Sequence, residues 1–240
     1  MNTIRQILLL PAACMLTLRP CIHFSTGGLG IFYQLGVTKY LLENYDFPES
    51  MSYSGISAGS FCAMMLSTKV ETKVLDVMIE NFVSVATENE AGFWSTLNTT
   101  TKSAIFTNGE FDVPERLFIG TCKLFPFPER VFINDFEDAS DIVDACLVSS
   151  HVPFLCGTLG LMYRGHLMCD GGVIGKHDTP DNLNKIIDVK CNMFRDDVMD
   201  LKDVFTWNPD IQRRLYLDGY RDSITYRNKL DKSLIIYRRI

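Results

Sequence analysis

From Cys21 onward, short apolar runs alternate with segments in which apolar residues recur at helical spacing. The runs Cys21–Ser25, Met51–Ser54, Arg130–Asn134, Gly165–Cys169 and Lys185–Cys191 predict strands. The helical pattern predicts helices over Phe32–Asn44, Ala58–Leu66, Thr72–Val83, Asp138–Ser149 and Ile211–Tyr226. This alternation predicts an α/β domain with a mainly parallel sheet and helices on its faces.

Two segments depart from this pattern. Residues 89–109 are polar but carry Phe93, Trp94 and Phe106, which favours a lid or substrate-contact surface, or a loop fixed to the core by its aromatic side chains. Residues Ile7–Leu18 form an apolar run of 12 residues, shorter than the roughly 20 needed for a membrane-spanning helix. We expect residues 1–20 to pack on the domain or contact a membrane, with a cleaved signal peptide as the alternative. Residues 21–240 are expected to form one domain.

The composition of the chain excludes some classes of protein. The chain has 240 residues, 47% of them hydrophobic, which is typical of a single globular domain. A net charge of −6 argues against nucleic-acid binding through the phosphate backbone. The eight cysteines include no C-x-x-C pair and several lie in apolar runs, so we expect buried thiols in a reducing, cytoplasmic compartment rather than a metal site or a disulfide framework.

Gly55-Ile56-Ser57-Ala58-Gly59 is a G-x-S-x-G sequence between a predicted strand and a predicted helix. That strand-turn-helix context is the one that a nucleophile elbow requires. Gly55 and Gly59 would allow the tight turn, and Ser57 would lie at a helix N-terminus that favours developing negative charge. The alternative is a serine that only caps the helix.

A serine nucleophile needs a base, and Asp170 stands at the end of a predicted strand, before Gly171 and Gly172. The aspartate could take the proton itself, or Asp170-Gly171 could be an ordinary turn. His177 follows Asp170, as in the serine-acid-histidine order of α/β-hydrolases. However, too few residues precede Ser57 for the strands that those enzymes place before the nucleophile.

A third motif is the glycine turn Ser25-Thr26-Gly27-Gly28-Leu29-Gly30, between the first predicted strand and the first predicted helix. Backbone N–H groups in such a turn can converge on an oxyanion. The turn lacks the third glycine of a G-x-G-x-x-G dinucleotide loop, because position 33 is Tyr33. Phosphate binding is therefore disfavoured.

The three motifs in this order resemble the patatin-like phospholipase family. FSTGGLGIFYQLGVTKYL is similar to the family's oxyanion loop, YSGISAGSFCAMML to its nucleophile elbow, and SSHVPF with YRGHLMCDGG to the segment that leads into its aspartate. The resemblance covers about Cys21–Gly175, with a looser match in LYLDGYRDS. It implies a three-layer α/β/α fold, a Ser57–Asp170 dyad without histidine, and an oxyanion hole from the amides of Gly27, Gly28, Leu29 and Ala58.

The glycine turn also departs from the family pattern. Thr26 replaces a usual glycine, Gly30 a usual basic residue and Ile31 a further glycine. VIGKHDTP replaces the usual polar region after Asp170-Gly171-Gly172. These changes leave Ser57 and Asp170 in place, so we still expect activity, with altered efficiency or specificity.

The sequence thus predicts a serine lipid acyl hydrolase of the phospholipase A or acylglycerol lipase type, needing no cofactor and no metal. Its substrate would be a phospholipid or acylglycerol at a membrane or lipid-droplet surface, with Phe93, Trp94 and the apolar N-terminus as candidate contacts. A catalytically impaired lipid-binding or scaffold protein on the same fold is one alternative. A histidine-assisted esterase that uses His177 is another. The sequence does not indicate an oligomeric state.

Overall fold

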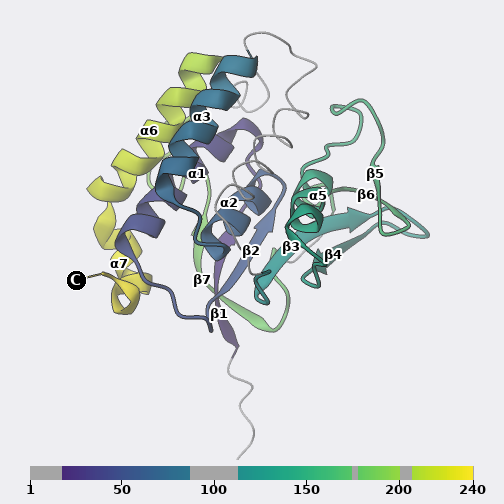
Figure 1. The fold of residues 1–240 in the computed structure, drawn as a ribbon, viewed down its shortest axis with the longest axis horizontal. Helices are drawn as coiled ribbons and strands as arrows, with labels where there is room; N and C mark the ends of the chain where they lie inside the picture. The colour runs from purple at the N-terminus through teal and green to yellow at the C-terminus, as the bar shows by residue number, and fades with distance from the viewer. Residues whose placement is uncertain (1–17, 87–112, 175–177, 201–206, 240) are drawn as a thin grey trace, which may run out of the picture.

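A computed structural model describes residues 18–86, 113–174, 178–200 and 207–239 (Figure 1). The strands are β1 (Arg19–Phe24), β2 (Ser52–Ile56), β3 (Leu117–Lys123), β4 (Glu129–Ile133), β5 (Leu161–Tyr163), β6 (His166–Asp170) and β7 (Leu183–Val189). The α-helices are α1 (Ile31–Asn44), α2 (Ala58–Ser67), α3 (Thr72–Ala86), α5 (Ala139–Ser149), α6 (Pro209–Thr225) and α7 (Arg227–Leu234). Two 3₁₀ turns are η1 (Gly28–Gly30) and η4 (Ile235–Tyr237).

The seven described strands form one sheet in the order β5-β6-β3-β2-β1-β7, and β4 pairs with β3 outside this path. Strands β7, β1, β2 and β3 run parallel to one another. The pairings of β3 with β4, of β3 with β6 and of β5 with β6 are antiparallel. The parallel strands therefore carry both glycine-rich turns, and an antiparallel strand brings in Asp170.

The predicted α/β class, with a central sheet flanked by helices, is confirmed. The sheet was predicted to be mainly parallel, whereas three of the six pairings between the described strands are antiparallel. Each predicted strand and helix within the described residues is present, with bounds shifted by a few positions. The prediction missed β3, β5 and α7. The omission of β3 matters most, because this strand joins the parallel and antiparallel parts of the sheet. Phe93, Trp94, Phe106 and residues 1–17 lie outside the described residues.

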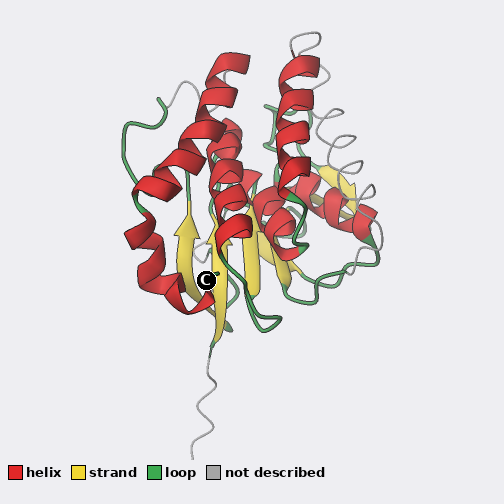
Figure 2. Cartoon of the chain, turned by 60° about the vertical axis from the view of Figure 1, so that its left-hand side comes forward, coloured by secondary structure: helices red, strands yellow, loops and turns green. Residues whose placement is uncertain are grey.

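The main core lies between the sheet and the helices, which stand in front of the strands in Figure 2. Helix α2 is buried on all sides from Ala58 to Leu66, as its uniformly apolar sequence predicts, and packs against β1, β2 and β3. Helices α1 and α6 approach closely at Gly36 and Gly219. A Cβ on Gly36 would lie 2.1 Å from the carbonyl oxygen of Tyr216, and one on Gly219 would lie 2.1 Å from that of Tyr33. Helix α1 also packs against α2, so the strands and α1 together position α2 and the turn that carries Ser57.

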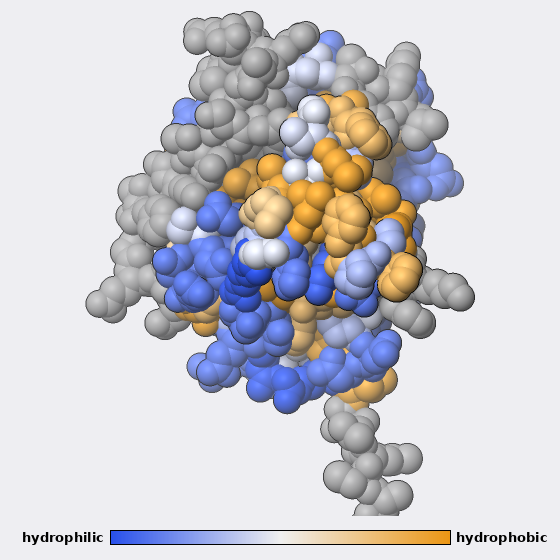
Figure 3. All heavy atoms as spheres, turned by 90° about the vertical axis from the view of Figure 1, so that its right-hand side faces the viewer, coloured by the Kyte–Doolittle hydropathy of each residue, from blue (hydrophilic) through white to orange (hydrophobic). Residues whose placement is uncertain are grey.

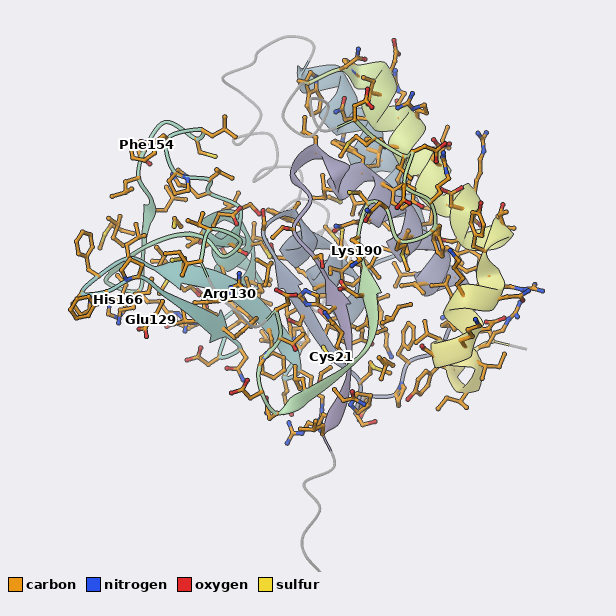
Figure 4. All side chains as sticks on the ribbon, turned by 180° about the vertical axis from the view of Figure 1, so that it is seen from behind. Cys21, Glu129, Arg130, Phe154, His166 and Lys190 are labelled. Carbon is orange, nitrogen blue, oxygen red and sulfur yellow. The ribbon has the colours of Figure 1, made fainter. Side chains whose placement is uncertain are left out.

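A second, smaller apolar cluster consists of strand residues: Cys21, Phe118 and Leu183, with Phe132 against them. Cys21 lies on β1 and is labelled in the view from behind (Figure 4).

All seven cysteines among the described residues are free, and five of them are buried. No helix in the described ranges combines the length and the apolar character needed to cross a bilayer.

Candidate active site

Ser57 occupies the turn between β2 and α2 in a conformation that is rare for a residue with a side chain, with φ 57° and ψ −132°. Hydrogen bonds to Ser149 and Ser60 hold this turn. The Ser57 N–H donates to Ser149 Oγ at 2.8 Å, and Ser60 Oγ donates to the Ser57 carbonyl oxygen at 2.6 Å. Such strain persists where surrounding contacts determine the backbone, and it occurs often at functional sites.

The two glycines of G-x-S-x-G allow backbone segments to approach each other. A Cβ on Gly55 would lie 2.4 Å from the carbonyl oxygen of Gly59, and one on Gly59 would lie 2.3 Å from that of Phe24. These distances are well below any normal contact. The start of α2 is therefore packed directly onto the end of β1, just before the glycine turn.

Asp170 ends β6 and lies beside Ser57, 113 positions away in the sequence. Its Oδ2 accepts a hydrogen bond from Ser57 Oγ at 2.5 Å, and its Oδ1 accepts one from the Gly172 N–H at 2.6 Å. Ser57 and Asp170 are 6% and 4% exposed. The sequence-predicted nucleophile and base are thus brought into direct contact.

Burial raises the pKa of Asp170 above its ordinary value. The hydrogen bonds from Ser57 and Gly172 and the positive charge of Arg130 act in the opposite direction but only partly offset the burial. A carboxylate is a weak base toward a hydroxyl, and removal from water raises its affinity for a proton. The site therefore makes Asp170 a better proton acceptor than an exposed aspartate.

The glycine turn lies against the loop that follows Asp170. Gly28 has φ 50°, and the Gly30 N–H donates to the Gly27 carbonyl oxygen at 2.8 Å, which closes the turn η1. A Cβ on Gly172 would lie 2.7 Å from Thr26 Cγ2. The turn and the Asp170-Gly171-Gly172 loop therefore pack together beside Ser57.

The candidate oxyanion donors are the amides of Gly27, Gly28, Leu29 and Ala58. Gly28 and Leu29 open η1, and Ala58 is the first residue of α2. The first N–H groups of a helix have no carbonyl partner within that helix and are available to an anion. Gln34 supports the turn from α1, because its Nε2 donates to the Ser25 carbonyl oxygen at 2.9 Å.

The histidines occupy other places. His23 is buried in β1 with Nδ1 3.3 Å from Ser54 Oγ, and burial lowers its pKa to about 4. His151 Nε2 lies 2.9 Å from Thr158 Oγ1. His166 begins β6, and His177 lies outside the described residues. Within the described part of the chain, the acceptor for Ser57 Oγ is Asp170.

Sequence reasoning missed two residues that support the site. Ser149, at the end of α5, accepts from the Ser57 N–H and donates from its Oγ to the Gly120 carbonyl oxygen at 2.7 Å. Arg130 Nε donates to the Gly171 carbonyl oxygen at 2.8 Å. Both act through tertiary contacts with the backbone, and no local spacing in the sequence marks such contacts.

Replacing Ser149 by alanine is expected to lower the free energy of unfolding by about 1–3 kcal/mol, because two buried backbone groups lose their partner. Chemical denaturation measures this change. Ser67→Ala is the matched control, since among the described residues the partner of Ser67 Oγ is the Met64 carbonyl oxygen of its own helix. Equal stabilities of the two variants would contradict a supporting role for Ser149.

A family model described as patatin-like phospholipase matches residues 22–180. The chain belongs to this family. The matched range includes all three motifs, from the glycine turn to Asp170-Gly171-Gly172. This match confirms the family resemblance that the motifs indicate. Patatin-like proteins are generally lipid hydrolases.

Individual relatives are distant. The human protein named 1-acylglycerol-3-phosphate O-acyltransferase PNPLA3 is 25% identical over 174 residues, which cover 63% of this chain and 33% of that protein. The chain therefore spans about a third of the length of this curated relative. Similar solved structures include VipD from Legionella pneumophila (12% identity, TM-score 0.44, covering 92% of this chain and 68% of that one) and the type III effector ExoU (14% identity, TM-score 0.44, covering 88% and 53%).

The departure from the patatin-like pattern at Gly30 has a structural counterpart. A Cβ at this position would lie 3.0 Å from Cys191 Cβ and 3.1 Å from Met199 Cε. A basic side chain would therefore displace one of these neighbours. The side chains of Cys191 and Met199 therefore leave little space beside Gly30 for a larger residue.

Proposed function

We propose that this protein is a serine lipid acyl hydrolase that cleaves fatty-acyl esters of phospholipids or acylglycerols through a Ser57–Asp170 dyad. The observation that carries the proposal is the 2.5 Å hydrogen bond from Ser57 Oγ to Asp170 Oδ2 inside a buried, strained turn. A nucleophile and a base within hydrogen-bond reach are the minimum for acyl transfer. Membership of a family of lipid hydrolases supports a lipid ester as the substrate.

In the first step, Ser57 Oγ attacks the ester carbonyl carbon while its proton passes to Asp170 Oδ2. The tetrahedral intermediate carries its negative charge toward the amides of Gly27, Gly28, Leu29 and Ala58. When it collapses, the alcohol leaves with the proton from Asp170 and an acyl-serine remains. Water, deprotonated by the same carboxylate, then releases the fatty acid and restores Ser57.

The decisive experiment combines hydrolysis of a chromogenic short-chain ester with labelling by a fluorophosphonate probe, followed by peptide mass spectrometry. We expect hydrolysis and a single label on Ser57, because the probe reacts with activated serines. Absence of both, or a label on another serine, would overturn the proposal. A panel of phospholipids and acylglycerols, with product analysis, would then identify the head group and the acyl position.

The acid limb of the pH profile should report on Asp170. A general base must be ionised, so kcat/KM should rise with pH through the raised pKa of Asp170 and then level off. We expect the midpoint above the ordinary aspartate value of 3.8, because burial opposes ionisation. A pH-rate titration with the soluble ester measures it. A midpoint at or below 3.8 would contradict this expectation. If His177→Ala removed the rise of kcat/KM with pH, the base would be His177 instead.

Acyl transfer to an alcohol is a second candidate, because the human relative carries the name of an acyltransferase. The same acyl-serine would be resolved by the hydroxyl of a lysophospholipid instead of water. Adding 1-acylglycerol-3-phosphate to the assay separates the two: transfer yields a diacyl product, whereas hydrolysis yields only free fatty acid. A lipid-binding protein without turnover would give neither product, and its vesicle binding would survive Asp170→Asn.

A further inference from the structure

Apolar side chains gather on the face that lies at the right of Figure 1, over β5, β6 and the connection from α5 to β5 (Figure 3). We define the apolar rim as six exposed residues of these segments and of the loop after Asp170: Phe154, Leu155, Leu159, Met162, Val173 and Ile174. Phe154 is 79% exposed and Met162 is 68% exposed. Grouped exposure of this kind marks interaction surfaces, whereas single exposed apolar residues do not.

The apolar rim is continuous with the candidate active site. The Asp170 N–H donates to the His151 carbonyl oxygen at 2.9 Å, and the Gly171 N–H donates to the Ser149 carbonyl oxygen at 3.2 Å. The rim residues follow these hydrogen-bonded residues closely in the sequence: Phe154 follows His151 by three residues, and Val173 follows Asp170 by three. Whatever covers the rim therefore lies next to the loop that carries Asp170.

The outward placement of Phe154 is fixed by the backbone. Phe154 has φ 65°, an unfavourable value for an aromatic residue. Its N–H donates to the Thr158 carbonyl oxygen at 3.0 Å, and its own carbonyl oxygen accepts from the Gly157 N–H at 3.2 Å. Figure 4 shows Phe154 on the connection that projects beyond β5 and β6. The loop therefore holds the Phe154 ring in solvent, although burial of an aromatic ring is energetically favourable.

Charge is absent from the chain segments of the rim. Residues 152–162 and 171–174 contain no Asp, Glu, Lys or Arg. Arg164, at the tip of the β5–β6 hairpin, is paired with Asp135 at 2.8 Å and Asp141 at 2.6 Å. The rim therefore presents no cation of its own to an anionic head group, and the net charge of −6 disfavours an anionic surface.

We propose that the apolar rim docks the protein on a neutral or zwitterionic lipid surface by inserting Phe154, Leu155 and Met162 among the acyl chains. This inference rests on the proposed function, which requires a lipid ester to reach Ser57. A lipid surface both covers the rim and supplies the ester at its edge. A protein partner would cover the same residues without delivering substrate.

The test is sedimentation of the full chain with sucrose-loaded vesicles of phosphatidylcholine alone. We expect the Phe154→Asp/Leu155→Asp double variant to bind about tenfold more weakly or worse, because two charges replace apolar contacts at the depth of the acyl chains. Met162→Asp, on β5, provides an independent site in the same rim. Binding by the unaltered protein should not increase with added phosphatidylserine or decrease with added salt.

The matched control is Ile235→Asp/Ile236→Asp, which places the same charges on exposed apolar residues of η4 (55% and 78% exposed). This variant should bind as the unaltered protein does, and circular dichroism should show that all variants are folded. Equal binding by the rim variants and the control would overturn the inference. So would binding that requires phosphatidylserine, or rim-dependent self-association without vesicle binding, which would make the rim a protein contact.

Hydrolysis of a soluble short-chain ester distinguishes failure of this inference from failure of the proposed function. The rim variants should cleave the soluble ester at the normal rate but cleave vesicle-held phosphatidylcholine about tenfold more slowly. If the unaltered protein binds vesicles through the rim but cleaves neither ester, the proposed function is wrong and the docking surface stands. If it cleaves both esters and the rim variants lose nothing, the docking surface is wrong and the function stands.

Discussion

Ser57→Ala and Asp170→Asn should each lower kcat for a short-chain ester by roughly 10³-fold or more, and the double variant should be no slower than either single variant. The reason is that, in the proposed mechanism, the two residues act as one unit. Without Asp170 the proton on Ser57 Oγ has no acceptor at 2.5 Å, and without Ser57 the carboxylate has no nucleophile to activate. Steady-state kinetics of the three variants measure this non-additivity.

The fluorophosphonate probe separates the two roles. Ser57→Ala should abolish labelling, whereas Asp170→Asn should slow it, because the nucleophile remains but is not activated. Asp197→Asn, at a surface acid that is 80% exposed and paired with Arg195, is the control for removing a negative charge. Near-normal turnover by Asp170→Asn together with loss in Ser57→Ala would mean that another group is the base, and His177→Ala would then be the next variant to measure.

The part of the fold that the sequence predicted is the part that local chemistry determines. Helix α2 reads as buried because it is apolar on all sides, and α5 begins where Asp138 caps it by accepting from the Asp141 N–H at 2.8 Å. Strand β3 was missed although its segment LFIGTC is apolar, because nothing in that short run indicates pairing with β2, β4 and β6 at once. Such pairing is a property of the whole sheet.

The candidate site also contains residues that the sequence predicts and residues that only the structure shows. Glycines and a serine at fixed spacing mark the turn of Ser57, since the backbone there needs close approach and a positive φ. Pairing Ser57 with Asp170 needed the order of three motifs and the resemblance to a family, because 113 positions separate them. Ser149 and Arg130 hold backbone groups of the site from α5 and β4, and only the folded chain reveals them.

Gly59→Ala should lower the free energy of unfolding by about 3 kcal/mol or more, although the opposite sign is normal for this substitution within a helix. Gly59 is the second residue of α2, where alanine would ordinarily stabilise by about 0.5–1 kcal/mol. Here the added Cβ would lie 2.3 Å from the Phe24 carbonyl oxygen and 2.6 Å from that of Ser25. Both are backbone atoms, so relief requires β1 and α2 to move apart.

That movement would also displace the site, because Ser57 precedes α2 and the glycine turn follows β1. We therefore expect kcat to fall even where Gly59→Ala is folded, and denaturation together with ester kinetics measures both effects. Gly165→Ala is the control. Its φ of 77° is costly for alanine, but no atom of the described residues beyond its chain neighbours lies within 4 Å of the new Cβ, so this variant should lose only about 1–2 kcal/mol and keep its activity. A Gly59→Ala protein as stable and active as the unaltered chain would show that β1 and α2 can separate without disturbing Ser57.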